Sequence, residues 1–332
     1  MDLFKQNLIL LFFISFLVTF LIIPFFINIA FKFNIVDKPD GNLKKHKKIT
    51  PYLGGISIFL GLTITSFIAL QFKMFQLHLP FFLFLIGIFL LLVLGLIDDI
   101  YVLKPIHKIF GQTIVAIFFI LSGFVFNLFS IQCFNIFLSI FWYLTIMNAF
   151  NLVDVMDGLA TTLSISCCSS FIIFSLFMNN LNLGLFMVQL LGSLLAFLMF
   201  NRPIAQIYLG DSGSLFLGGF FSVIPFLLFN PNVMTDFHYF LIAFLILFIP
   251  IFELVSLIMI RSYKGIPFYL GSPDHFSIIL QNKNWSKQKI LYYVVLGNLF
   301  LLVSAISILF HELWLLIFFG TFIISWIINI YK

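Results

Sequence analysis

Four polar side chains recur every third residue at the end of one apolar segment. Asn148, Asn151, Asp154 and Asp157 stand at this spacing, directly before Gly158. In a straight α-helix they would fan over about 180°, whereas a final turn tightened toward three residues per turn would align them. Gly158 would then let the chain leave the helix. Four such groups together favour a binding pocket over a solvated helix end.

A second group of candidates is a pair of adjacent carboxylates, Asp98 and Asp99, at the end of another apolar segment. Two carboxylates this close repel each other unless a cation lies between them. Mg²⁺ accepts one or two carboxylates together with water and phosphate oxygens. The pair is therefore a candidate divalent-ion site, and an acidic flank that ends the helix is the alternative.

A third carboxylate, Asp211, stands between Gly210 and Gly213. Glycines let backbone N–H groups approach an anion, and a helix that begins at residues 212–214 would present its positive end there. The alternative is a short turn in which Asp211 or a neighbouring serine caps the helix.

Two basic segments could contact phosphate. The run 44–48 contains Lys45, His46 and Lys47 and leads into an apolar segment, although contact with anionic lipid headgroups explains most such runs. Arg261 and His275 lie in or beside the last long polar segment. A histidine oriented by a neighbouring acid could donate a hydrogen bond to a phosphate.

The elements that must position these residues are membrane helices. Of 332 residues, 62% are hydrophobic and 9% are charged, whereas about a quarter of residues are charged in soluble proteins. This composition excludes a soluble Rossmann, barrel or sandwich enzyme. It predicts an all-α, polytopic membrane bundle of about 11 transmembrane helices (10 or 11), over the approximate ranges 7–31, 53–71, 79–97, 106–123, 134–150, 159–178, 184–200, 214–229, 237–259, 290–309 and 312–330.

The chain reads as a single domain, 1–332, with its polar loops near 32–52, 98–107, 150–158, 201–213 and 260–289. The first apolar run is longer than a signal-peptide core and is expected to be a retained helix. Cys133, Cys167 and Cys168 lack CxxC spacing, which argues against disulfide scaffolds and zinc sites. They are expected to be packing residues.

Charge predicts the orientation. Fifteen of the 17 Lys and Arg residues fall on alternate loops and the C-terminal tail, so the positive-inside rule places these in the cytoplasm and the N-terminus outside. Most carboxylates fall on the same side, which predicts a polar site at the cytoplasmic face. An ion-coupled transporter would instead need acidic groups near the midplane and repeated broken helices.

The order of these motifs resembles the polyprenyl-phosphate N-acetylhexosamine-1-phosphate transferases of glycosyltransferase family 4, from about Asp37 to Trp285. The resemblance implies that Asp98, Asp99 and Asp211 are catalytic and that Mg²⁺, or Mn²⁺, is held by Asp211 with one acid of the pair, assigned to Asp99. It implies substrate-binding roles for the remaining candidates: Lys45, His46, Lys47, Asn148, Asn151, Asp154, Asp157, Arg261 and His275.

The implied partners are a UDP-N-acetylhexosamine, by default UDP-GlcNAc, polyprenyl phosphate and membrane lipid. No nucleic acid is expected, and the sequence leaves open whether the chain forms a homodimer. The implied reaction, at the bacterial inner membrane, starts a lipid-linked glycan of the cell envelope, such as an O-antigen of lipopolysaccharide. Direct attack by the lipid phosphate and a covalent intermediate on Asp98 are both open, as is a lipid-diphosphate hydrolase that uses water as acceptor.

Three positions depart from the family pattern. Val155 replaces a usual glycine, Glu253 stands where an aspartate is common, and a single His275 replaces a run of histidines. The missing histidines argue against the MurNAc-pentapeptide branch. The departures fall where sugar choice is expected, so the sugar stays open.

Overall fold

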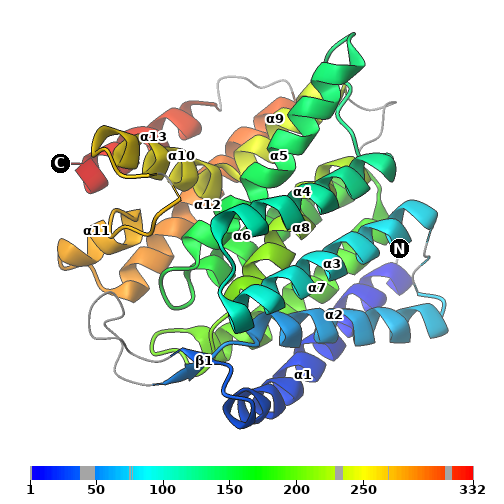
Figure 1. The fold of residues 1–332 in the computed structure, drawn as a ribbon. Helices are drawn as coiled ribbons and strands as arrows, with labels where there is room; N and C mark the ends of the chain where they lie inside the picture. Colours follow the sequence, from blue (N-terminus) through cyan, green and yellow to red (C-terminus); the bar gives the residue numbers. More distant parts are fainter. Residues whose placement is uncertain are drawn as a thin grey trace.

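The computed structural model describes residues 2–37, 49–74, 76, 78–228, 235–267, 269–310 and 316–331. They fold almost entirely into helices, with one two-stranded ribbon (Figure 1). The elements are α1 (Asp2–Lys32), β1 (Val36–Asp37), β2 (Thr50–Pro51), α2 (Gly54–Gln71), α3 (Leu79–Tyr101), α4 (Pro105–Leu121), α5 (Gln132–Val153), α6 (Leu159–Phe177), α7 (Leu181–Asn201), α8 (Gly210–Leu228), α9 (Asp236–Ile246), α10 (Phe248–Tyr263), α11 (Phe276–Asn282), α12 (Lys287–Phe310) and α13 (Ile317–Tyr331).

The helical membrane bundle predicted from composition is confirmed. Eight of the described helices are long and apolar enough to cross a membrane, or nine if α9 and α10 form one bent span. Two further apolar helices, α4 and α13, are shorter. The predicted total of about 11 spans stays a prediction.

The predicted helix 237–259 is interrupted. It consists of α9 and α10, which meet at Leu247 with a bend of 74°. Proline has no N–H to donate to the carbonyl four residues earlier, so Pro250, in the first turn of α10, cannot bond to Ile246. Continuing α9 through this point would leave that carbonyl unpaired, which favours the break.

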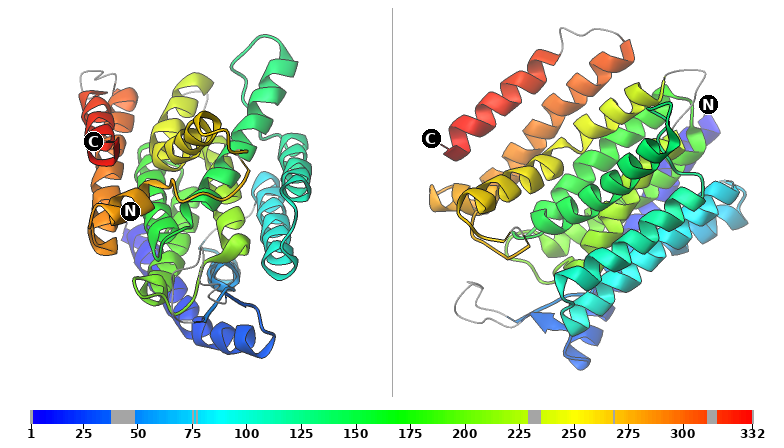
Figure 2. Two further views of the ribbon diagram at one scale, coloured as in Figure 1. Left: turned by 60° about the vertical axis from the view of Figure 1, so that its left-hand side comes forward. Right: turned by 45° about the horizontal axis from the view of Figure 1, so that its top comes forward.

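Most of the long helices run roughly parallel, and α8 lies inside the bundle against α2, α3 and α5 (Figure 2). Nearly every residue of α8 is buried, whereas α1 lies at the edge against α2 and α7. The N-terminus lies at the end of the bundle opposite β1 and α11 (Figure 2). We call the end with β1, α11 and segments 154–158 and 202–209 the polar end.

Two glycines bring neighbouring helices onto the start of α8. A Cβ atom on Gly95 of α3 would lie 2.3 Å from the carbonyl oxygen of Asp211. One on Gly55 of α2 would lie 2.2 Å from the Cα of Gly213. Because real Cβ atoms do not approach this closely, only glycine allows α2 and α3 to pack here. The first turn of α8 is thus held between two helices.

The ribbon of β1 and β2 lies against the segment before α8. The N–H of Tyr208 donates to Pro51 O at 2.8 Å, and the N–H of Gly55 donates to Leu209 O at 2.9 Å. The two strands that flank segment 38–48 are therefore held beside the start of α8. Lys45, His46 and Lys47 lie within that segment, outside the described residues.

The cysteines differ in exposure. Cys167 and Cys168 are buried, as expected of packing residues, but Cys133 in the first turn of α5 is exposed. The expectation that all three are packing residues is therefore wrong for Cys133, because α5 begins at the edge of the bundle.

Candidate active site

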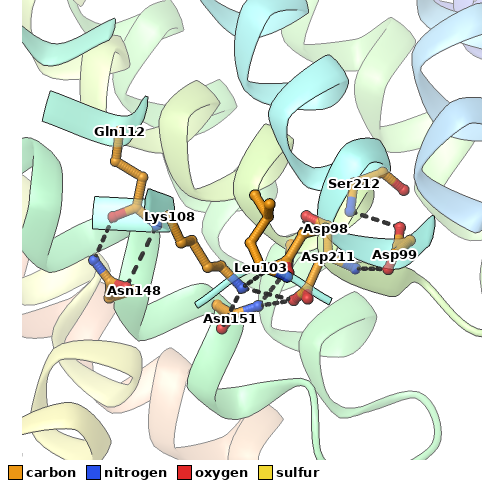
Figure 3. A network of polar contacts seen from close by, with 10 residues as sticks. Asp98, Asp99, Leu103, Lys108, Gln112, Asn148, Asn151, Asp211 and Ser212 are labelled. Carbon is orange, nitrogen blue, oxygen red and sulfur yellow. Dashed lines mark hydrogen bonds and ion pairs between the residues drawn. The ribbon is translucent and has the colours of Figure 1, made fainter. Parts of the chain in front are cut away.

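A lysine and two carboxylates from three helices meet at the polar end (Figure 3). The Nζ of Lys108, in α4, lies 2.8 Å from Asp98 Oδ2 of α3 and 3.0 Å from Asp211 Oδ1 of α8. Asp98 is buried and also accepts a hydrogen bond from the N–H of Leu103 at 2.7 Å. A lysine ammonium group therefore lies between Asp98 and Asp211, and the divalent ion predicted at the Asp98–Asp99 pair stays a prediction.

Both asparagines of the repeated motif join this group from α5. Asn151 Oδ1 lies 3.3 Å from Lys108 Nζ, and its Nδ2 donates to Asp211 Oδ1 and, at 2.9 Å, to Ser214 Oγ. Asn148 exchanges hydrogen bonds with Gln112 of α4, the shorter of them 2.7 Å long. The two amides therefore connect α5 to α4 and α8.

Asp99 contacts α8 through its backbone. Its Oδ1 accepts a hydrogen bond from the N–H of Asp211 at 2.7 Å, and its Oδ2 accepts one from the N–H of Ser212 at 3.0 Å. The predicted anion at this helix end is therefore Asp99. Because Asp99 satisfies these amides, α8 begins at Gly210, four residues before the predicted start. An N-cap by Asp211 or a serine, the alternative weighed from sequence, is not what satisfies the two amides.

Asp154 and Asp157 follow α5 on a turn. The N–H of Asp154 donates to Asn151 O at 3.3 Å, three residues back, as the predicted tightened turn requires. Burial, followed by the negative charges of Asp211, Asp99 and Asp157, raises the pKa of Asp154 to about 8. Asp157 Oδ2 accepts from Lys287 Nζ at 2.7 Å, which ties the turn to the start of α12.

Asn201, at the end of α7, joins the loop that carries Asp154 and Asp157 to the loop that leads into α8. Its Oδ1 accepts from the N–H of Gly158 at 3.1 Å, and its Nδ2 donates to Ile207 O at 2.9 Å. A buried amide with both ends satisfied fixes the loops relative to each other.

A second polar group lies on α10 and α11. Glu253 Oε1 accepts a hydrogen bond from the N–H of Phe276 at 3.3 Å and lies 3.0 Å from His275 Nδ1. Glu253 and His275 are both buried. Arg261 Nε donates to Ser272 Oγ at 3.0 Å.

Asp274 belongs to the same group through its ion pair with Lys264. Burial opposes ionisation of Asp274, but hydrogen bonds from Lys264 and Ser272 and the positive charges of Lys264 and Arg261 lower its pKa. The polar loop before α11 is thus held in place by charge as well as by the Glu253 contacts.

The predicted gathering of acids at one end of the bundle is confirmed for Asp98, Asp99, Asp154, Asp157 and Asp211. The repeated broken helices expected of a transporter are not seen in the described ranges, where α9–α10 forms the one broken pair. The sequence did not single out Lys108, Gln112, Asn201, Ser214 or Lys287. Lys108 and Gln112 are four residues apart in an apolar segment, so they share one helix face. This spacing could have indicated a polar face of that helix turned toward the site.

The oxygen donors suit a hard divalent ion. Asp98 Oδ2, Asp211 Oδ1 and Asn151 Oδ1 all lie within 3.3 Å of one point, the Nζ of Lys108. The described residues contain no group of three or more His, Cys, Asp and Glu side chains that could hold a metal ion. Mg²⁺ does not require one, because it keeps several waters and binds through one or two carboxylates plus substrate phosphates.

Residues 81–229 match the family model described as glycosyl transferase family 4. The chain is 30% identical over 324 residues to a probable undecaprenyl-phosphate N-acetylglucosaminyl 1-phosphate transferase of Bacillus subtilis, covering 94% of this chain and 88% of that protein. It is 33% identical over 260 residues to the undecaprenyl-phosphate alpha-N-acetylglucosaminyl 1-phosphate transferase of Thermotoga maritima, covering 76% of each.

A phospho-N-acetylmuramoyl-pentapeptide-transferase of Staphylococcus saprophyticus is 31% identical over 312 residues, covering 85% of this chain and 94% of that protein. The similarity thus extends over nearly the whole chain and to enzymes with either sugar. The matched segment contains Asp98, Asp99, Lys108 and Asp211, the residues that meet at the polar end. The chain belongs to glycosyl transferase family 4, the polyprenyl-phosphate N-acetylhexosamine-1-phosphate transferases, in their undecaprenyl-phosphate GlcNAc-1-phosphate transferase-like branch.

Proposed function

We propose that this enzyme transfers N-acetylhexosamine-1-phosphate from a UDP-sugar, by default UDP-GlcNAc, to undecaprenyl phosphate and releases UMP. The observation that carries the proposal is the contact of Lys108 with Asp98 and Asp211 at one end of a membrane bundle. A phosphate on a lipid and a water-soluble diphosphate can meet only at the membrane surface. A charged group at the end of the bundle is suited to bind both of them there.

The proposed step is a direct displacement at phosphorus. An oxygen of the lipid phosphate forms a bond to the β-phosphorus of the sugar nucleotide, and the bond from that phosphorus to the bridging oxygen of UMP breaks. The second pKa of a phosphate monoester is about 6, so the attacking oxygen is largely ionised at pH 7. A strong general base is therefore not required.

The side chains divide into charge-bearing and positioning groups. The sequence assigned the metal to Asp211 with Asp99, but both oxygens of Asp99 accept backbone N–H groups of α8, so we assign it to Asp211 with Asp98. Mg²⁺ held there would neutralise the diphosphate and stabilise UMP as leaving group. Lys108 is suited to bind phosphate oxygens, and Asn151 holds Asp211 and Ser214 in register. Arg261 and His275 are proposed contacts for the diphosphate, and Asn148, Asp154 and Asp157 for the nucleotide and sugar.

The site is proposed to face the cytoplasm across the bacterial inner membrane. The basic residues of alternate loops support this orientation through the positive-inside rule. Sugar nucleotides are made in the cytoplasm, so the donor would arrive at this face, while the lipid acceptor would approach within the inner leaflet.

The test uses the purified full-length protein, labelled UDP-GlcNAc, undecaprenyl phosphate and Mg²⁺. We expect labelled lipid diphosphate-sugar and an equal amount of UMP, and a loss of at least 100-fold in Asp211→Asn, the scale seen for removal of one preorganised charge-stabilising group. Full activity in Asp211→Asn would contradict the metal assignment. Release of sugar phosphate without the lipid acceptor would indicate a hydrolase.

The sugar is tested with a panel of UDP-amino sugars offered under the same conditions. UDP-GlcNAc should give the highest kcat/KM. Preference for UDP-MurNAc-pentapeptide or for a deoxy-amino sugar would keep the reaction class and replace the donor.

A further inference from the structure

The ammonium group of Lys108 lies where a divalent ion would be expected. Its nearest oxygens are Asp98 Oδ2 at 2.8 Å, Asp211 Oδ1 at 3.0 Å and Asn151 Oδ1 at 3.3 Å (Figure 3). These are the hard donors that Mg²⁺ prefers. The lysine side chain is 15% exposed and that of Asp98 7%, so water screens this pair weakly, whereas the side chain of Asp211 is 33% exposed and opens the group to solvent.

Asp98 and Asp211 are the carboxylates of this group that contact Lys108. Asp99, the third acid of the group, has both oxygens on the N–H groups of Asp211 and Ser212. An ion that enters would therefore be held by Asp98 and Asp211. It would meet the ammonium of Lys108 at the same oxygens, and two cations this close repel strongly.

We propose that Lys108 is a built-in counter-cation that occupies the divalent-ion position until a diphosphate binds, so that metal and sugar nucleotide bind cooperatively. The inference rests on the proposed function, because it requires that the substrate be a diphosphate. Without a diphosphate, an entering ion must displace Lys108 and leave its charge without an anionic partner. With a diphosphate, the ammonium exchanges carboxylate oxygens for phosphate oxygens.

The position of Lys108 suits this exchange. It lies in the first turn of α4, after a proline that begins the helix, and its flexible four-carbon stem gives the ammonium group a wide reach. The carboxylates are fixed instead. Leu103 N–H holds Asp98, and the first turn of α8 that carries Asp211 is held by Asp99 and by close contact with Gly95.

The test measures Mn²⁺ binding to the purified full-length protein by electron paramagnetic resonance, with and without UDP. In the unaltered protein, UDP should tighten Mn²⁺ binding at least tenfold. In Lys108→Met, which keeps an unbranched side chain and removes the charge, Mn²⁺ alone should bind at least tenfold more tightly than in the unaltered protein. The further effect of UDP should then be smaller.

The matched control is Lys104→Met, which removes one positive charge from the exposed residue just before α4. It should leave Mn²⁺ binding within about twofold, because the exposed charge of Lys104 is screened by water and salt, whereas Lys108 is largely buried in contact with the carboxylates. Mn²⁺ binding to Lys108→Met that is equal to or weaker than in the unaltered protein would overturn the inference. Lys108→Gln repeats the test with a polar side chain, should the methionine variant be poorly folded.

A second substitution locates the ion. Asp98→Asn, added to Lys108→Met, should weaken Mn²⁺ binding at least tenfold, and retained tight binding would overturn the inference. Transfer activity is a separate readout. An unaltered protein that makes no lipid product with any UDP-sugar would refute the proposed function, whereas the Mn²⁺ titrations need no turnover.

Discussion

At the scale of single residues, the carboxyl group of Asp154 is expected to lower the stability of the metal-free protein as the pH rises. Its pKa is raised from 3.8 to about 8 by burial and by the charges of Asp211, Asp99 and Asp157. Between these values the folded protein keeps a proton that the unfolded chain releases. The free energy of unfolding therefore falls with pH across this window, by at most about 1.4 kcal/mol per pH unit for one proton.

Thermal unfolding in detergent with EDTA, between pH 6 and 9, checks this prediction. Asp154→Asn, which has a similar shape and does not titrate, should flatten the decline of the melting temperature with pH. An equally steep decline in both proteins would assign the pH dependence to another group.

At the scale of the elements, Glu253 joins α10 to the start of α11. Its carboxylate contacts His275 and the N–H of Phe276, and a shorter acid in its place would not reach both. In Glu253→Asp we expect the KM for the UDP-sugar to rise about tenfold, the equivalent of one lost hydrogen bond. The value of kcat should change less, because the proposed function places the reacting atoms at the Lys108 group.

Steady-state kinetics on Glu253→Asp and Glu253→Gln distinguish the effect of the side-chain length at position 253 from the effect of its negative charge. The glutamine keeps the length and an acceptor oxygen, so its KM should stay closer to that of the unaltered enzyme. A normal KM in Glu253→Asp would show that the contact between α10 and α11 does not position a substrate-binding group.

At the scale of the whole molecule, labelling of the native cysteines can test the orientation of the protein in the membrane. Cys133 is exposed in the first turn of α5, and Asn148 and Asn151 bring the other end of α5 to the polar end. A membrane-impermeant maleimide added to intact cells should therefore label Cys133 from outside. Cys167 and Cys168 are buried and should remain unlabelled.

The matching control places a cysteine at the polar end, with Lys264→Cys in a Cys133→Ser background. Lys264 is half-exposed beside α10, so a cysteine there can react with the reagent. Because the proposed orientation places this end in the cytoplasm, it should react only after the cells are permeabilised. Labelling of Lys264→Cys in intact cells would reverse the proposed orientation.

Much of this architecture follows from local sequence. Long apolar segments must become helices in lipid, because a helix satisfies every backbone polar group within itself. Charged side chains must then collect at helix ends, since their burial in hydrocarbon is costly. For these reasons the sequence predicted the bundle, the position of α5 and α8 and the shared end of Asp98, Asp154 and Asp211.

The tertiary structure alone decided which side chains meet. Asp99 binds the backbone of Asp211, 112 residues further along the chain, and no local periodicity encodes that α3 and α8 are neighbours. Lys108 was one more positive residue near the start of the predicted helix 106–123, and only the packing of α4 beside α3 and α5 brings it to Asp98 and Asp211. Hydropathy sets where each helix ends, whereas the packing of side chains across helices sets which charges share one site.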